Sequence, residues 1–420
     1  MTTTALPERR LDYLDAVRAY ALLLGIVFHA SLTFLPIYIG WAVQDVSTSP
    51  LISVFVLVSH SFRMELFFLI AGFFSHMTFH RKGGAAFLKG RFFRIVIPFV
   101  VGWFALRPLL ISGWIMGGAS LRGDVDIRAG LAGGFQSLSS LPEGIFTGTH
   151  LWFLYYLTLI TGVFLTLRAA LTARPLWYAR LTGIADAGLG WLARSPLTIF
   201  ILAVPTGVAL WFMQNWGMDT PDLSLVPHLP ATAVYGGCFA LGWALHRNAN
   251  WLTSMTRLSP VTLLAAVGSI VAVLWLSGIQ GNTAHSYYRE ARIGFVTGYG
   301  VMMWSVIFLT IGVFRKLIQK PNKVIRYVAD SSYWLYLLHL PVVIWLQVAF
   351  AELPMHWTLK LVSISALTIG GSLLLYDLFV RSTFVGALLN GRRRPSWFWE
   401  KMRSLKREIP VRVETVTTND

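Results

Sequence analysis

Residues 14–35 read LDAVRAYALLLGIVFHASLTFL, an almost continuous apolar run that carries Arg18 and His29. A helix needs about 20 apolar residues to cross the hydrocarbon core of a bilayer, so this run predicts a membrane-spanning helix. Comparable runs recur along the chain, at residues 51–79, 95–116, 151–171, 197–216, 231–246, 261–278, 293–314, 333–350 and 357–380. The sequence therefore predicts an all-α integral membrane protein, built as a single bundle of about ten transmembrane helices.

The composition excludes a soluble enzyme. Of the 420 residues, 55% are hydrophobic and only 13% are charged, and the mean hydropathy is +0.61. Soluble domains carry about 25% charged residues, and no stretch of this chain is polar enough to form such a domain. The single cysteine, Cys238, excludes an internal disulfide framework and a cysteine-rich metal site, and its apolar neighbours predict a packing role.

The distribution of basic residues predicts the topology. The net charge is +16, and the positive-inside rule places segments rich in Lys and Arg in the cytoplasm. Such segments lie at 80–94, 172–196, 246–257 and 315–326 and after residue 380, whereas those at 36–50 and 217–230 contain no Lys or Arg. Spread over loops, these cations do not form the localised patch that nucleic-acid binding requires. Both termini are therefore expected in the cytoplasm, with a transmembrane domain at 1–380 and a basic cytoplasmic tail at 381–420.

Two segments between the apolar runs are long enough to have structure of their own. Residues 117–149 are rich in Gly and Ser and are expected outside, either as a lid or as a surface loop. Residues 172–196 mix Leu and Trp with Arg, a pattern that predicts an amphipathic helix along the membrane surface.

Ionisable side chains inside a span are costly and usually mark function. Arg18 and His29 are eleven residues apart, which places them on one face of a helix and about 16 Å apart along its axis. With the N-terminus inside, Arg18 lies near the cytoplasmic surface and His29 lies deep. The alternative is an ordinary interfacial cation and a histidine that packs between helices.

The second apolar run adds a polar sequence, His60-Ser-Phe-Arg63-Met-Glu65. In an antiparallel helix, His60 reaches about the depth of His29, with Arg63 somewhat closer to the cytoplasm. Arg63 and Glu65 are two residues apart and face different directions, so each needs a partner from another helix. The pattern favours a polar cleft between the first two spans over structural pairing of helices.

Three further groups of polar residues follow. Arg91 and Arg94 are three residues apart at a cytoplasmic helix start, which suits two phosphate oxygens; a plain positive-inside cluster is the alternative. His150 begins the fourth span, and His339 lies in the ninth, next to Pro341, where we interpret it as structural. The chain contains no GxSxG, HExxH or Walker sequence, so hydrolase, zinc-protease and nucleotide-motif interpretations have no support, and no metal site is predicted.

These residues together resemble a known family. Arg18 and His29 are similar to the Arg-x10-His signature of the membrane-bound acyltransferase-3 superfamily, and residues 67–73 resemble its second-span motif, with Ala71 where many members have Ser. Later family blocks recur in the expected order, at Arg91-x-x-Arg94-Ile-x-x-Pro98, His150-Leu-Trp-Phe-Leu154 and Tyr336-Leu-Leu-His339. The second span, around His60 and Arg63, is most similar to the branch that succinylates osmoregulated periplasmic glucans.

The resemblance implies an O-acyltransferase in the inner membrane of a bacterium. Its partners would be the lipid bilayer, a donor acyl-CoA (succinyl-CoA in the glucan branch) and the hydroxyls of a periplasmic glucan or other carbohydrate, with no permanently bound cofactor. His29, with Arg18, would be catalytic, as a general base or as an acyl carrier. The residues expected to bind substrate are Arg91, Arg94, Arg63, His60, Glu65, His150 and His339.

Other interpretations remain open at this stage. The acceptor in an O-acetyltransferase would be another surface glycan. A secondary transporter would have a similar number of spans, but it should show two related halves, which the sequence does not. A lipid-linked glycosyltransferase would need carboxylates in an outer loop, where Asp124, Asp126 and Glu143 follow no pattern.

Overall fold

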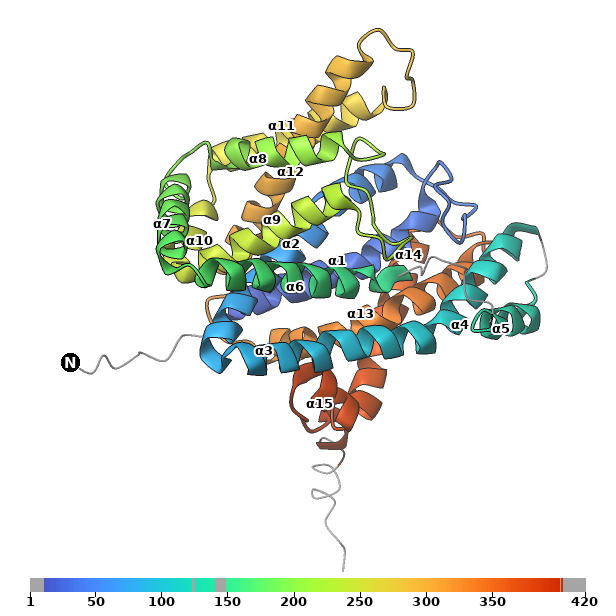
Figure 1. Ribbon diagram of the computed structural model, residues 1–420. Coiled ribbons are helices and arrows are strands. Elements are labelled where there is room, and N and C mark those ends of the chain that lie inside the picture. The colour runs from blue at the N-terminus through green and yellow to red at the C-terminus, as the bar shows by residue number, and fades with distance from the viewer. Residues whose placement is uncertain (1–10, 123–124, 140–148, 401, 403–420) are drawn as a thin grey trace, which may run out of the picture.

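The computed structural model describes residues 11–122, 125–139, 149–400 and 402. These residues form helices and connecting segments, with no β-strand among them, so the predicted all-α class is confirmed. The α-helices are α1 (Asp12–Ser31), α2 (Pro50–Lys82), α3 (Gly84–Arg91), α4 (Ile97–Ala119), α5 (Ile127–Gln136), α6 (Trp152–Thr172), α7 (Pro175–Leu192), α8 (Thr198–Trp211), α9 (Leu229–Arg247), α10 (Ala249–Met255), α11 (Pro260–Ser277), α12 (Tyr288–Leu317), α13 (Lys323–Phe350), α14 (Trp357–Leu375) and α15 (Phe384–Asn390) (Figure 1).

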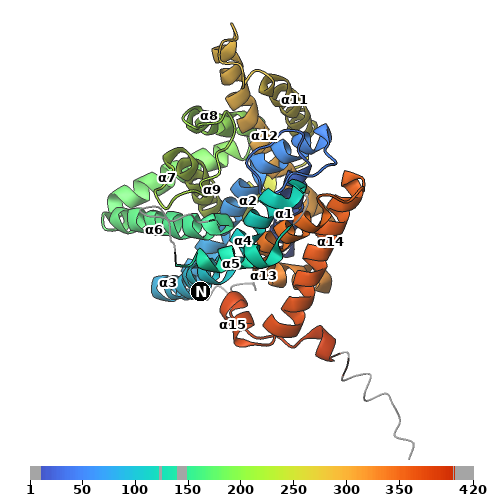
Figure 2. The same ribbon diagram turned by 90° about the vertical axis from the view of Figure 1, so that its right-hand side faces the viewer.

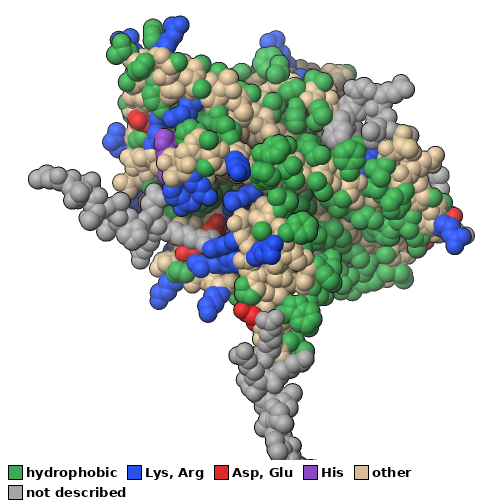
Figure 3. Space-filling model, turned by 60° about the horizontal axis from the view of Figure 1, so that its bottom comes forward, with side chains coloured by type: hydrophobic (Ala, Val, Ile, Leu, Met, Phe, Trp, Pro, Cys, Tyr) green, Lys and Arg blue, Asp and Glu red, His purple; other side chains and the backbone are tan. Residues whose placement is uncertain are grey.

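Within the described ranges, eight helical segments are long and apolar enough to cross a membrane: Asp12–Phe34, Pro50–Lys82, Gly84–Ala119, Trp152–Thr172, Pro260–Ser277, Tyr288–Leu317, Lys323–Phe350 and Trp357–Val380. The other two predicted spans correspond to α8, a shorter apolar helix, and to α9. The chain is thus a multi-pass membrane protein, whereas ten spans and cytoplasmic termini remain predictions. Figure 3 shows the broad hydrophobic surface that such a bundle presents to lipid.

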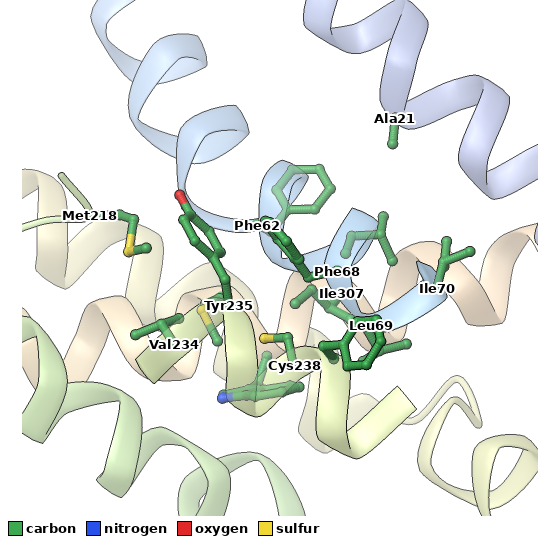
Figure 4. Close-up of a cluster of buried hydrophobic side chains, with 14 of the residues drawn as sticks. Ala21, Phe62, Phe68, Leu69, Ile70, Met218, Val234, Tyr235, Cys238 and Ile307 are labelled. Carbon is green, nitrogen blue, oxygen red and sulfur yellow. The ribbon is translucent and has the colours of Figure 1, made fainter. Parts of the chain in front are cut away.

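The helices pack around α1 and α2. α1 contacts α2, α12, α13 and α14, and the most extensive contact in the fold joins α2 to α9. Two glycines permit this close approach, because a Cβ on Gly72 or Gly242 would overlap a backbone carbonyl of the opposite helix. Beside this contact, Phe68, Tyr235 and Cys238 belong to a buried hydrophobic cluster, in agreement with the packing role predicted for the cysteine (Figure 4).

Several connecting segments are more ordered than the sequence suggested. Residues 80–94, expected as a loop, are mostly helical. α2 ends at Lys82, its C-cap residue Gly83 has a φ of 79° that favours glycine, and α3 starts directly after Gly83. A π-helical turn, η2 (Phe92–Val96), then joins α3 to α4. None of the residues of α7 is buried. This is what a helix that lies along the membrane surface would show.

The segment 117–149, which is expected outside, contains a helix, α5, which packs along α4. Asp126 is the N-cap residue of α5, where its carboxylate accepts a hydrogen bond from the amide of Ala129 at 2.9 Å. Asp124 and Glu143 lie outside the described residues. Asp126 therefore has a structural role of its own.

The C-terminal segment folds back on the bundle. After a second π-helical turn, η5 (Tyr376–Val380), α15 packs near η2 and α13, and described residues continue to Trp399 and Glu400. Figures 1 and 2 both show α15 on the side of the bundle opposite α8 and α11. The first twenty residues of the predicted tail are thus part of the folded structure.

Candidate active site

A single large cavity brings together nearly all the residues that the sequence singled out. Its volume is about 990 Å³, and α1, α2, α3, α6, α13 and α15 contribute to its wall. The predicted site residues that line it are Arg18, His29, His60, Arg63, Arg91, Arg94, His150 and His339. Figure 3 shows a hollow with Lys and Arg side chains gathered around it.

The cavity has two chemically different ends. The basic mouth (Arg18, Lys82, Lys89, Arg91 and Arg94) is formed where α1 and α13 begin and where α2 ends. The histidine end (His29, His60, His150 and His339) lies farther along the same helices and at the start of α6. Charged donors for an anion and imidazoles for proton transfer therefore share one enclosed space.

His29 is held from several sides. The Trp41 ring stacks on it at 5.7 Å between centroids, and the His339 ring lies 5.3 Å away. Gln347 donates from Nε2 to the backbone oxygen of His29 at 2.9 Å, and its Oε1 accepts from Trp41 Nε1 at 2.9 Å. The Nδ1 atom of His29 is buried without a hydrogen-bond partner among the described residues. The imidazole is thus fixed in position by packing, and its Nδ1 is available to a ligand.

The loop that carries Trp41 is anchored by a buried ion pair. Asp45 Oδ1 accepts a hydrogen bond from Lys360 Nζ at 2.7 Å, and the two residues are 4% and 0% exposed. Burial raises the pKa of the Asp45 carboxyl, and the hydrogen bond from Lys360 opposes that shift. This pair ties the segment before α2 to α14 and so supports the ring that packs on His29.

Backbone carbonyls fix which nitrogen of two histidines carries the proton. His150 Nε2 lies 2.9 Å from the oxygen of Leu337, and His339 Nδ1 lies 2.6 Å from the oxygen of Tyr336. A carbonyl only accepts, so in each ring the nitrogen that faces it is the donor. The other nitrogen of each ring then presents a lone pair, and His150 Nδ1 has no partner within the described ranges. Both lone pairs suit a hydroxyl donor.

Arg63 is the cation nearest to the histidine end. Its Cζ lies 4.3 Å from the centroid of the Phe28 ring. Its Nε and Nη1 are buried with no hydrogen-bond partner in the described structure. Gly25 faces this guanidinium, and a Cβ there would lie 3.2 Å from Nη1. Arg63 therefore offers unused donors to an anionic ligand.

Two predictions about the second span have different outcomes. His60 lines the cavity, stacks on Phe28 at 5.8 Å, and places Nε2 3.1 Å from the hydroxyl of Thr220. Glu65, which the prediction included among the binding residues, is fully buried and is not among the residues that line the cavity. Two residues of helix turn it by about 200° from Arg63.

At the basic mouth, each arginine has a defined neighbour. Arg18 donates to the oxygen of Ala329 at 3.4 Å and pairs with Asp15 at 3.4 Å. Arg91 donates to the hydroxyl of Ser75 and lies over the Phe87 ring. The guanidinium of Arg94 lies against Gly391.

Some residues that line the cavity were not singled out from the sequence, and one had two interpretations. Lys82 and Lys89 were treated as ordinary loop cations, yet they line the mouth. His339 was both interpreted as structural and included among the binding residues, and its ring lies 5.3 Å from that of His29 and 5.6 Å from that of His150. Trp152, which was not among the predicted site residues, is 8% exposed and lines the cavity. The periodicity of apolar residues does not distinguish a side chain that faces lipid from one that lines a cavity inside the protein.

Comparisons with known proteins identify the family of the chain. A family model described as "Acyltransferase domain", of the acyltransferase-3 type, matches residues 11–377. The chain belongs to the acyltransferase-3 family. It is 27% identical over 399 residues to "Glucans biosynthesis protein C" from Escherichia coli O17:K52:H18 (strain UMN026 / ExPEC), with 92% of this chain and 96% of the relative covered. The protein of the same name from Escherichia coli K12 shows the same identity and coverage.

No solved structure gives a significant match to the chain. Among the described residues of this acyltransferase, no group of three or more His, Cys, Asp or Glu side chains is placed to hold a metal ion.

Proposed function

We propose that this acyltransferase moves an acyl group from cytoplasmic acyl-CoA to a hydroxyl of a periplasmic carbohydrate. The observation that carries the proposal is the single cavity that joins the basic mouth to the histidine end. A donor with an anionic nucleotide and a thioester at its far end matches a cavity with cations at one end and imidazoles at the other.

The donor would enter at the basic mouth. Arg91 and Arg94 both line it, and guanidiniums are suited to phosphate oxygens because two donors act in parallel. Arg18 and His29 line the same cavity and are separated by about 16 Å along α1. An extended pantetheine arm can bridge this distance and bring the thioester carbon to His29.

His29 would act as the general base. It takes the proton of the acceptor hydroxyl as the hydroxyl oxygen forms a bond to the thioester carbonyl carbon. The C–S bond then breaks, the CoA thiolate leaves, and the imidazolium of His29 returns the proton to the sulfur. His150 and His339, which present lone pairs, would accept hydrogen bonds from other hydroxyls of the sugar and orient it.

A covalent route uses the same atoms in a different order. In that route a nitrogen of His29 attacks the thioester carbon, CoA leaves, and the acyl group passes from the imidazole to the sugar hydroxyl. Incubation with isotopically labelled acyl-CoA and no acceptor separates the two routes. A mass increase on the peptide that contains His29, with one CoA released per protein, supports the covalent route.

We propose succinyl as the acyl group and a glucan as the acceptor. Arg63 has unused donors near His29, and a succinyl chain carries a free carboxylate beyond its thioester. The similarity to "Glucans biosynthesis protein C" supports a glucan acceptor. Acetylation of another surface glycan is the alternative, in which Arg63 contacts the sugar or the donor.

The test uses purified protein in liposomes with succinyl-CoA and a purified periplasmic glucan. Wild type should release CoA and raise the mass of the glucan by one or more succinyl groups. His29→Ala should abolish both products, whereas His285→Ala, which alters a histidine outside the cavity wall, should retain them. Activity of His29→Ala within about tenfold of wild type would remove His29 from the chemistry. Transport of an unmodified glycan with no CoA release would favour an exporter.

A further inference from the structure

The cavity wall extends beyond the acyltransferase domain. The family match ends at residue 377, yet the basic mouth is closed on one side by α15 and the residue after it. The residues from this segment that line the cavity are Phe384, Ala387, Leu388, Leu389, Asn390 and Gly391. A segment outside the shared domain therefore contributes to the proposed donor path.

Asp377 holds the segment in place from the last turn of the domain. Its Oδ2 accepts hydrogen bonds from the Ser396 hydroxyl at 2.7 Å and from the Phe398 amide at 2.9 Å. Its Oδ1 accepts from the Trp397 amide at 3.2 Å. Asp377 and Ser396 are 6% and 3% exposed. Hydrogen bonds to a buried carboxylate are stronger than those between neutral groups, so this anchor is firm.

A second anchor ties the segment to α13, which carries His339. Arg394 Nη1 pairs with Asp330 Oδ2 at 2.7 Å. The guanidinium of Arg381 lies against the rings of Tyr327 and Trp397, at 4.8 and 5.1 Å from their centroids. These contacts join both ends of α15 to the bundle.

The segment also contacts Arg94, which we propose binds a phosphate of the donor. Gly391 ends α15 with φ +77°, a left-handed conformation that favours glycine. Its α-carbon faces Arg94 so closely that a Cβ would overlap the guanidinium. Arg94 therefore keeps its place only because residue 391 has no side chain.

We infer that residues 384–394 form a donor-binding cap. The apolar side chains of α15 pack against the adenine ring of acyl-CoA, and Gly391 positions Arg94 on a phosphate. The inference rests on the proposed function, and it adds a binding surface and a positioning residue that lie outside the acyltransferase domain. Arg392 and Arg393, both exposed and directly after Gly391, extend the basic mouth.

Ligand protection of a single cysteine tests the cap without any catalytic step. In a Cys238→Ala background, Leu388→Cys places a thiol on the cavity wall and Ser382→Cys places one on the exposed surface outside it. The probe ligand is desulfo-CoA, which has no thiol to consume the maleimide label. At ten times its Kd, labelling of Leu388→Cys should slow about tenfold, and labelling of Ser382→Cys should not change. Ala387→Cys repeats the test if Leu388→Cys does not fold.

Calorimetric titration of wild type with desulfo-CoA separates the two proposals. No binding to wild type would overturn the proposed donor itself. Binding to wild type with equal labelling rates of the cavity cysteine, with and without ligand, would overturn the cap alone.

Steady-state kinetics test the positioning role of Gly391. Gly391→Ala should raise the KM for acyl-CoA on the order of tenfold, because it displaces a charge-assisted contact, and should leave the KM for the glucan unchanged. Gly370→Ala, at an α14 position with open space around it, is the matched control and should behave as wild type. An unchanged KM for acyl-CoA in Gly391→Ala would remove the positioning role.

Discussion

Replacing Arg63 with Gln should make the enzyme lose succinyl transfer far more than acetyl transfer. Arg63 is 6% exposed, its guanidinium lies on the Phe28 ring, and its Nε and Nη1 have no partner within the described residues. Keeping such a cation buried and unpaired is costly in a membrane protein. A succinyl carboxylate would supply the missing hydrogen-bond acceptor, whereas an acetyl group carries no carboxylate.

The size of the effect follows from the contact that is lost. A hydrogen bond to a charged group contributes about 1.5–3 kcal/mol, and each 1.36 kcal/mol is a factor of about ten in rate. Succinyl transfer should therefore fall roughly 10- to 100-fold relative to acetyl transfer. Arg63→Lys should show a smaller loss, because an ammonium keeps the charge without the paired donors.

The assay measures kcat/KM for succinyl-CoA and acetyl-CoA in the same preparation and compares their ratio between variants. The ratio does not depend on the yield of folded protein. Arg107→Gln is the matched control: Arg107 is also 6% exposed and lies 4.9 Å from the Trp103 ring, but it is outside the cavity wall. Equal losses for both donors in Arg63→Gln would refute the carboxylate contact and make Arg63 structural, or a contact of the glucan or the donor phosphates.

Three further predictions concern the donor, the packing and the topology. Arg91→Ala with Arg94→Ala should weaken binding of desulfo-CoA by calorimetry, because both guanidiniums line the mouth, and unchanged binding would contradict the phosphate assignment. Gly242→Ala should destabilise the fold by about 1–3 kcal/mol in thermal unfolding, because its Cβ would overlap the Leu69 carbonyl. Gly237→Ala, which has open space at its Cβ, is the control and should unfold as wild type does. Reporter fusions within 172–196 should report cytoplasm and those within 217–230 periplasm, and the reverse result would invert the direction of transfer.

Much of the site was visible in the sequence because its residues are exceptions to a simple pattern. Arg18, His29 and Arg63 interrupt apolar runs, and helical periodicity alone places the first two on one face. The same periodicity separated Arg63 from Glu65, and the structure buries Glu65 away from the residues that line the cavity. The assignment of Glu65 to substrate binding stays a prediction, although its side chain does not line the cavity.

Other features needed the packing of distant segments. His150 and His339 lie 189 positions apart in the chain, and their rings meet at 5.6 Å. Nothing local to either residue distinguishes a cavity histidine from one that packs between helices. Lys82 and Lys89 gave no signal, because cations next to a span are expected at any cytoplasmic boundary.

The sequence by itself determined the membrane class, the helical content and the positions of the polar residues within each span, because hydropathy and a period of 3.6 residues are local properties of the chain. Only the tertiary structure decided which helices meet. The contact of Gly72 and Gly242 brings α2 against α9, and the Asp377 and Asp330 anchors bring α15 against the mouth of the cavity. Such contacts depend on side-chain shape between segments far apart in sequence, so the cavity exists only in the packed bundle.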